Sequence, residues 1–132
     1  MPRIRVLVVD DEPDFLKLIK RRLSKRNVDV DVAASGEEAL HFLEEARVDV
    51  VILDVRMPGM SGIETLKEIR KRFREVEVIM LTGHGSMQSG IEGMNLGAYD
   101  YILKPFSIDD LLTRIRAARE HAGLRRERRE NA

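Results

Sequence analysis

The stretch VLVVDDE, residues 6–12, decides the fold. Its first four residues are apolar and three of them are valines, a composition typical of a strand that is buried on both faces. Three carboxylates follow without a break, and like charges this close repel one another unless a cation compensates them. The stretch therefore predicts a buried strand that ends at a charged site.

Similar apolar runs recur along the chain and predict the remaining strands. The five predicted strands are residues 4–9, 28–33, 48–53, 76–81 and 99–103. The segments between them carry apolar residues at helical spacing. Three helix starts are marked by a serine with an acidic residue three positions later: Ser35 with Glu38, Ser61 with Glu64 and Ser107 with Asp110. Strands that alternate with helices predict a parallel sheet with helices on both faces.

The segment 85–97 is unusually rich in glycine for a helix. Gly97 is predicted to lie just after the helix, where a left-handed conformation is common. Gly90 and Gly93 lie inside the helix, where each costs about 1 kcal/mol relative to alanine. Two explanations remain open: close packing of this backbone on the sheet, or a helix that must shift during function.

Composition limits the classes of function. The 132 residues suit one domain, and a net charge of zero argues against non-specific binding to nucleic acid or to an anionic membrane. The absence of cysteine excludes disulfides, thiol nucleophiles and Cys-ligated zinc. No apolar run approaches the roughly 20 residues of a membrane span, and the first residues do not resemble a signal peptide. We therefore expect a cytoplasmic protein.

Further functional residues follow the other strands. Asp54, Thr82 and Lys104 each come at the end of a predicted strand, and in a parallel sheet these ends meet at one edge. One lysine cannot balance the three acids Asp10, Asp11 and Asp54, so a hard divalent cation is expected, Mg²⁺ before Ca²⁺ or Mn²⁺. A metal, an amine and a hydroxyl beside a carboxylate suit phosphoryl transfer, with Asp54 as the nucleophile.

These residues together resemble the receiver domain of two-component response regulators. The resemblance includes Asp10-Asp11, Asp54, Met57-Pro58-Gly59, Thr82, the run 97–101 and Lys104-Pro105, and it covers residues 4 to about 121. It implies a doubly wound, flavodoxin-like α/β fold in which five helices flank a five-stranded parallel sheet of order 2-1-3-4-5. It also implies that Asp54 accepts a phosphoryl group from a phosphohistidine, in a module that assists its own phosphorylation and dephosphorylation.

The resemblance assigns the other site residues as well. Asp11 and Asp54 would bind Mg²⁺ through their side chains, Arg56 through its backbone carbonyl and Asp10 largely through a water. Thr82 and Lys104 would contact the phosphoryl group, and the Lys104-Pro105 bond would be cis. On phosphorylation Thr82 would move and Tyr101 would turn inward. Arg56, Gly83 and His84 are candidates for tuning the lifetime of the phosphoryl group, with exposed loop residues as the alternative for Arg56 and His84.

The resemblance implies a sensor histidine kinase or a phosphotransfer protein as the partner, together with an unknown output protein. The face formed by the fourth helix, fifth strand and fifth helix would change, and it could also form a homodimer. No direct nucleic-acid or membrane contact is expected. Residues 1–121 would form the receiver and 122–132 a charged, fraying tail or linker, with His121 as a solvated helix position.

Three other classes of protein share some of these features. The chain could be a receiver module severed from a larger transcriptional regulator, or a pseudo-receiver that docks partners without phosphate. A metal-dependent phosphohydrolase would be expected to carry a second aspartate two positions after Asp54, where this chain has Arg56, and a cap segment that is not found here.

Overall fold

The computed structural model describes residues 3–83 and 87–130, in which strands and helices alternate as predicted. The strands are β1 (Ile4–Val9), β2 (Val28–Ala33), β3 (Val50–Asp54), β4 (Glu77–Thr82) and β5 (Asp100–Leu103). The helices are α1 (Pro13–Ser24), α2 (Gly36–Glu45), α3 (Gly62–Arg72), α4 (Met87–Asn95) and α5 (Ile108–Glu130).

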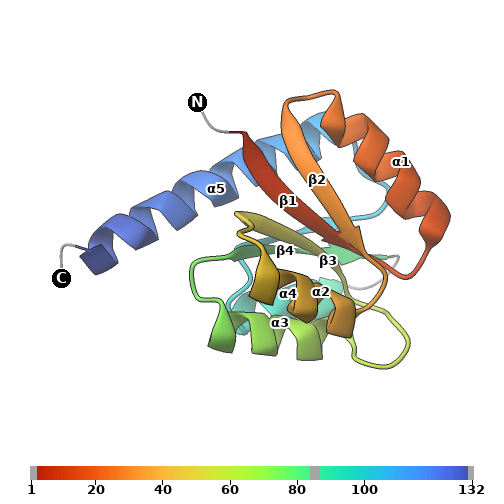
Figure 1. The fold of residues 1–132 in the computed structure, drawn as a ribbon. Coiled ribbons are helices and arrows are strands. Elements are labelled where there is room, and N and C mark those ends of the chain that lie inside the picture. The colour runs from red at the N-terminus through yellow and green to blue at the C-terminus, as the bar shows by residue number, and fades with distance from the viewer. Residues whose placement is uncertain (1–2, 84–86, 131–132) are drawn as a thin grey trace.

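All four neighbouring strand pairs are parallel, and the sheet has the order β2-β1-β3-β4-β5. This confirms the predicted topology. Figure 1 shows α1 and α5 on one side of the sheet and α2, α3 and α4 on the other. The carboxyl ends of the strands consequently meet at one edge, which is where the predicted site residues lie.

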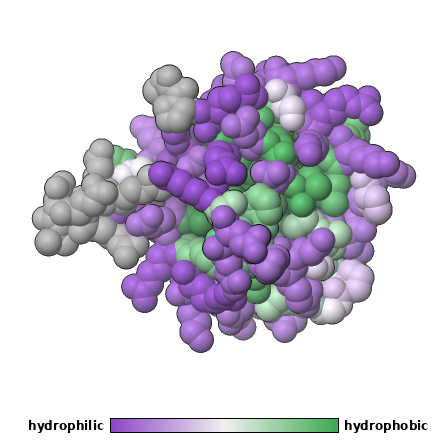
Figure 2. All heavy atoms as spheres, viewed as in Figure 1, coloured by the Kyte–Doolittle hydropathy of each residue, from purple (hydrophilic) through white to green (hydrophobic). Residues whose placement is uncertain are grey.

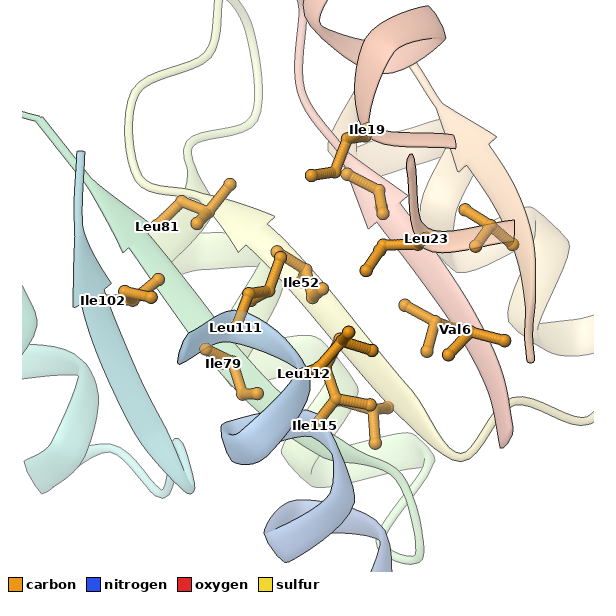
Figure 3. Packing of buried hydrophobic residues seen from close by; sticks show 14 of the residues in the cluster. Val6, Ile19, Leu23, Ile52, Ile79, Leu81, Ile102, Leu111, Leu112 and Ile115 are labelled. Carbon is orange, nitrogen blue, oxygen red and sulfur yellow. The ribbon is translucent and has the colours of Figure 1, made fainter. Parts of the chain in front are cut away.

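The burial of β1 explains its uninterrupted apolar sequence. Alternate residues of a strand point to opposite faces. Val6 and Val8 belong to the core beneath α1 and α5, whereas Leu7 and Val9 belong to the core beneath α2 and α3. Figure 3 shows the first of these cores, in which leucine and isoleucine side chains of α5 pack onto β3 and β4.

The predicted helix starts are confirmed by their hydrogen bonds. The Ser61 hydroxyl accepts from the backbone N–H of Glu64, whose carboxylate accepts from the backbone N–H of Ser61 in return. The Ser35 and Ser107 hydroxyls likewise accept from the backbone N–H three residues later. Each serine satisfies a donor that the first turn of a helix leaves without a partner.

The C-terminus of α4 also forms as predicted. Gly97 adopts a φ of 101°, a conformation that side-chain-bearing residues rarely take. The Gly97 N–H donates to the Met94 carbonyl, and the Ala98 N–H donates to the Gly93 carbonyl. These two hydrogen bonds form a Schellman motif.

The interior glycines of α4 allow close packing on the sheet. A Cβ atom on Gly90 would lie 2.6 Å from Cδ2 of Tyr101, and one on Gly93 would lie 2.9 Å from Cγ of Met80. Both distances are shorter than ordinary contacts, so alanine at either position would displace a side chain of the sheet. The structure thus supports the close-packing explanation for both glycines.

On the face shown in Figure 2, hydrophilic residues cover most of the surface and apolar residues are gathered towards its middle. At the sheet edge, β2 carries Asp29 and Asp31, and Asp29 pairs with Arg3 at 2.9 Å. Within residues 3–83 and 87–130, every helix is too short or too polar to cross a bilayer.

Helix α5 continues as one helix to Glu130, and Figure 1 shows it extending beyond the sheet. Ala122 is only 3% exposed, so packing against the body continues past residue 121. His121 is exposed, as predicted for a solvated helix position, and its Nδ1 in addition lies 2.5 Å from the buried Glu77 carboxylate, a contact that the sequence did not indicate.

Candidate functional site

Three carboxylates converge at the carboxyl edge of the sheet. Asp10 and Asp11 follow β1, Asp54 ends β3, and the two strands are adjacent. One oxygen of each carboxylate lies within 4.8 Å of the other two. We call Asp10, Asp11 and Asp54 the acidic cluster.

Asp10 is the buried member of this cluster, with no exposed surface. Its Oδ1 accepts from the backbone N–H of Glu12 at 2.9 Å, and its Oδ2 pairs with Lys104 Nζ at 3.1 Å. The Lys104 ammonium also lies 4.5 Å from the centre of the Phe15 ring, a cation–π contact. Lys104 is therefore held over the acidic cluster from two sides.

Asp54 is half-buried, and its Oδ1 accepts a long hydrogen bond of 3.4 Å from the Arg56 backbone N–H. Burial raises the pKa of Asp54 to about 6, and repulsion from Asp10 and, more weakly, Asp11 contributes to the rise. Lys104 and the Arg56 N–H oppose this shift. The ionised carboxylate is thus less stable here than in water, which favours the approach of a cation.

The raised pKa predicts a pH-dependent effect of Asp54→Asn on stability. The unfolded side chain titrates near 3.8 and the folded one near 6, so wild-type stability should fall as pH rises from about 4 to 6. Above pH 6, without divalent metal, Asp54→Asn should be more stable than wild type by about 1–2 kcal/mol, a value discounted for solvent screening.

Urea denaturation of both proteins at several pH values in chelator measures this difference. The difference should shrink towards zero as pH falls below 4, because wild-type Asp54 then becomes neutral in both states. A difference that is the same at pH 4 and pH 7.5 would contradict the raised pKa.

The acidic cluster suits a hard metal ion. Its donors are carboxylate oxygens from three residues, and among residues 3–83 and 87–130 Lys104 is the only cationic side chain that pairs with them. A divalent cation prefers such oxygens and would remove the remaining charge. The loop after Asp54 borders a cleft of about 470 Å³ beside Asp11, which leaves the Arg56 region accessible.

The predicted switch residues lie on the two strands that follow β3 in the sheet, Thr82 on β4 and Tyr101 on β5. Thr82 is fully buried at the end of β4, and its hydroxyl donates to the Ile102 carbonyl at 3.4 Å. Tyr101 is partly buried against Gly90 of α4. Gly83 is exposed, with open space where a Cβ would lie. His84 lies outside the described residues.

The backbone of the loop after Asp54 is fixed by a close contact that the sequence analysis missed. A Cβ on Gly62, the first residue of α3, would lie 2.1 Å from the Asp54 carbonyl oxygen. The Gly62 N–H also donates to the Val55 carbonyl at 3.0 Å. Gly59, with a φ of 72°, shapes the same loop. The Lys104-Pro105 peptide bond is cis.

Phe15 was missed as well, because its contact with Lys104 joins residues far apart in the sequence. The signal for Gly62 in the sequence was weak, because a glycine can equally serve a turn, a helix cap or a close backbone approach.

Comparison with known proteins agrees with this arrangement. The chain is 33% identical over 123 residues to the regulatory protein AtoC of Escherichia coli, covering 93% of this chain and 27% of AtoC. It is 44% identical over 113 residues to the transcriptional regulatory protein CpxR of Klebsiella pneumoniae, covering 86% and 48%. The chain spans between about a quarter and just over half of the length of such curated relatives.

A response regulator receiver domain protein from Clostridium thermocellum has a similar solved structure. The TM-score is 0.87 with 38% identity, over 92% of this chain and 98% of that one. The sequence profile of the response regulator receiver domain matches residues 6–116. The chain therefore belongs to the response regulator receiver domain family, the signalling modules of two-component systems.

Proposed function

We propose that Asp54 accepts a phosphoryl group from a phosphohistidine of a sensor histidine kinase or a phosphotransfer protein. The observation that carries this proposal is the position of Asp54, a half-buried carboxylate within 4.8 Å of Asp10 and Asp11. Lys104, bound to Asp10, is the nearby cation. A carboxylate nucleophile surrounded by like charges needs a bound cation before it can attack an anionic phosphoryl group, and sites of phosphoryl transfer use a divalent metal for this purpose.

In the proposed reaction an Asp54 oxygen attacks phosphorus as the bond to the donor nitrogen breaks. The electron pair of that bond stays on the histidine ring, and Asp54 becomes an acyl phosphate. Asp10, Asp11, Asp54 and the Arg56 carbonyl would hold Mg²⁺ or Mn²⁺, which neutralises phosphoryl oxygens when bound. Lys104 would exchange part of its contact with Asp10 for a phosphoryl oxygen, and Thr82 would leave the Ile102 carbonyl to donate to another.

Intact mass after incubation with acetyl phosphate tests the proposal. We expect wild type to gain one phosphoryl group with Mg²⁺ and none with chelator, and Asp54→Asn to gain none in either case. Asp31→Asn, on the edge strand, is the matched control and should label like wild type. Labelling that persists in Asp54→Asn would identify another acceptor, and no labelling of wild type would favour a phosphate-independent docking module.

The output of this switch is proposed to be the face formed by α4, β5 and α5. Ile91, Met94 and Leu103 are exposed there, although large apolar side chains favour burial. A phosphoryl group adds roughly −1.5 to −2 of charge by analogy with other phosphorylated residues. Through Thr82 and Tyr101 that charge would alter this face, which would bind an output protein or a second copy.

The kind of protein in which this receiver works is a further part of the proposal. The longer relatives support a receiver that works within a larger regulator, and a stand-alone receiver is the alternative. A kinase as donor would place the module in the cytoplasm. Arg56 and Gly83 are exposed, and both would border the proposed acyl phosphate and set how quickly water reaches it.

A further inference from the structure

The end of β4 opposite Thr82 carries a second charged site. Glu77, the first residue of β4, is only 1% exposed. Its Oε1 lies 3.1 Å from Arg125 Nη1 and 3.4 Å from Arg70 Nη1, and its Oε2 lies 2.5 Å from His121 Nδ1. Buried carboxylates require such partners, because water no longer solvates the charge.

The partners of Glu77 come from two different helices. Arg70 belongs to α3 and also donates to the Val76 carbonyl at 2.5 Å, so it is tied to the start of β4. Arg125 belongs to α5 and donates to the Arg74 carbonyl at 2.9 Å. The His121 ring packs against Tyr99, with ring centres 5.1 Å apart. One carboxylate thus links the body of the domain to the last turns of α5.

Apolar packing does not extend as far along α5 as these polar contacts do. Among the α5 side chains described, Ala122 is the last buried one, and Leu124 is 50% exposed. The contacts of His121 and Arg125 are therefore what hold the helix to the body near residue 125. His121 and Arg125 themselves lie outside residues 6–116, the part that matches the family profile.

Separation of α5 from the domain would not leave the Glu77 carboxylate without a partner. If the end of α5 separated, Arg70 would still pair with Glu77, so the buried charge would not be left alone. Burial lowers the pKa of the Arg70 guanidinium, and the nearby Arg125 lowers it further, which means that the two guanidinium groups repel each other. The contact between Arg125 and Glu77 can therefore break while Arg70 keeps the buried carboxylate paired.

We propose that Glu77, His121 and Arg125 form an intramolecular latch that holds the part of α5 after residue 118 to the rest of the receiver through residues 121 and 125. Residues 108–118 remain packed on the sheet whether the latch is closed or open. The latch sets the direction in which α5 leaves the body, and its opening frees this part of the helix as a unit. It does not depend on the phosphorylation proposed for Asp54.

Amide hydrogen exchange of the full chain, without phosphodonor, tests the latch. Arg125→Met keeps most of the apolar stem and removes the charge, and Arg116→Met, at an exposed position of the same helix, is the matched control. We expect exchange in residues 119–130 to be at least tenfold faster in Arg125→Met than in Arg116→Met. Exchange in β1 and β3 should be equal in the two variants. Equal exchange in residues 119–130 would overturn the proposal.

Glu77→Gln is the second variant, because it removes the charge from the other partner. It should accelerate exchange in residues 119–130 more than in β1, and uniform acceleration throughout the chain would overturn the latch in favour of a general loss of stability.

The distance between two spin labels tests the latch independently of changes in the free energy of unfolding. The chain has no cysteine, so spin labels at Lys67→Cys and Glu120→Cys, both exposed positions, would be the only pair. We expect a narrow distance distribution that broadens with Arg125→Met and not with Arg116→Met. A distribution equally narrow in both would contradict a latch that fixes the helix.

Discussion

Gly62→Ala is expected to destabilise the protein by about 3 kcal/mol and to abolish phosphoryl acceptance at Asp54. The added Cβ would lie 2.1 Å from the Asp54 carbonyl oxygen and 2.7 Å from the Val55 Cα. Both are backbone atoms, so no side chain can move aside to relieve the contact. Either β3 or the start of α3 must shift, and the proposed acceptor shifts with it.

Urea denaturation and acetyl phosphate labelling of Gly62→Ala measure the two effects. Gly123→Ala is the matched control, because it lies in a helix and a Cβ there meets nothing within 4 Å. The control should be as stable as wild type or up to about 1 kcal/mol more stable. Wild-type stability and labelling in Gly62→Ala would mean that the close contact does not constrain the loop.

Lys104→Met is expected to lower stability by about 2–4 kcal/mol in chelator, because it leaves the fully buried Asp10 without its ion-pair partner. Methionine retains an apolar stem against Phe15, so the loss should come mainly from the missing charge. Mg²⁺ should recover part of the loss, since a cation in the acidic cluster replaces some of the missing positive charge.

Denaturation of Lys104→Met with and without Mg²⁺ measures both effects, and Lys67→Met, an exposed position of α3, is the control. The control should differ from wild type by no more than about 0.5 kcal/mol. A Lys104→Met protein as stable as wild type in chelator would show that the Glu12 N–H and solvent are enough to stabilise the Asp10 carboxylate without an ion pair. A deficit unchanged by Mg²⁺ would argue against metal binding at the cluster.

The fold could be predicted largely because its signals are local. The bounds of β1 and β2 match the predicted ranges, since each is a short β-branched run with polar residues at its ends. The third strand was predicted at residues 48–53 but lies at Val50–Asp54. Val48 is buried without pairing, and the Asp49 N–H donates to the Arg5 carbonyl just before the strand begins.

The acidic cluster was predictable for a related reason: parallel strands bring their carboxyl ends to one edge whatever the helices do. Contacts that depend on the reach of side chains were not predictable. Phe15 over Lys104 and His121 on Glu77 each join positions more than 40 residues apart. A glutamate at the start of a strand also gave no sign that it would be almost fully buried.

The two aspartates of β2 bear on how the protein behaves at high concentration. An edge strand exposes unpaired backbone groups that can template growth of the sheet by another copy. Two copies meeting along β2 would bring Asp29 and Asp31 of one chain near those of the other, and like charges at such an edge repel. The valine-rich strand that helps to form the core thus carries its own protection against aggregation.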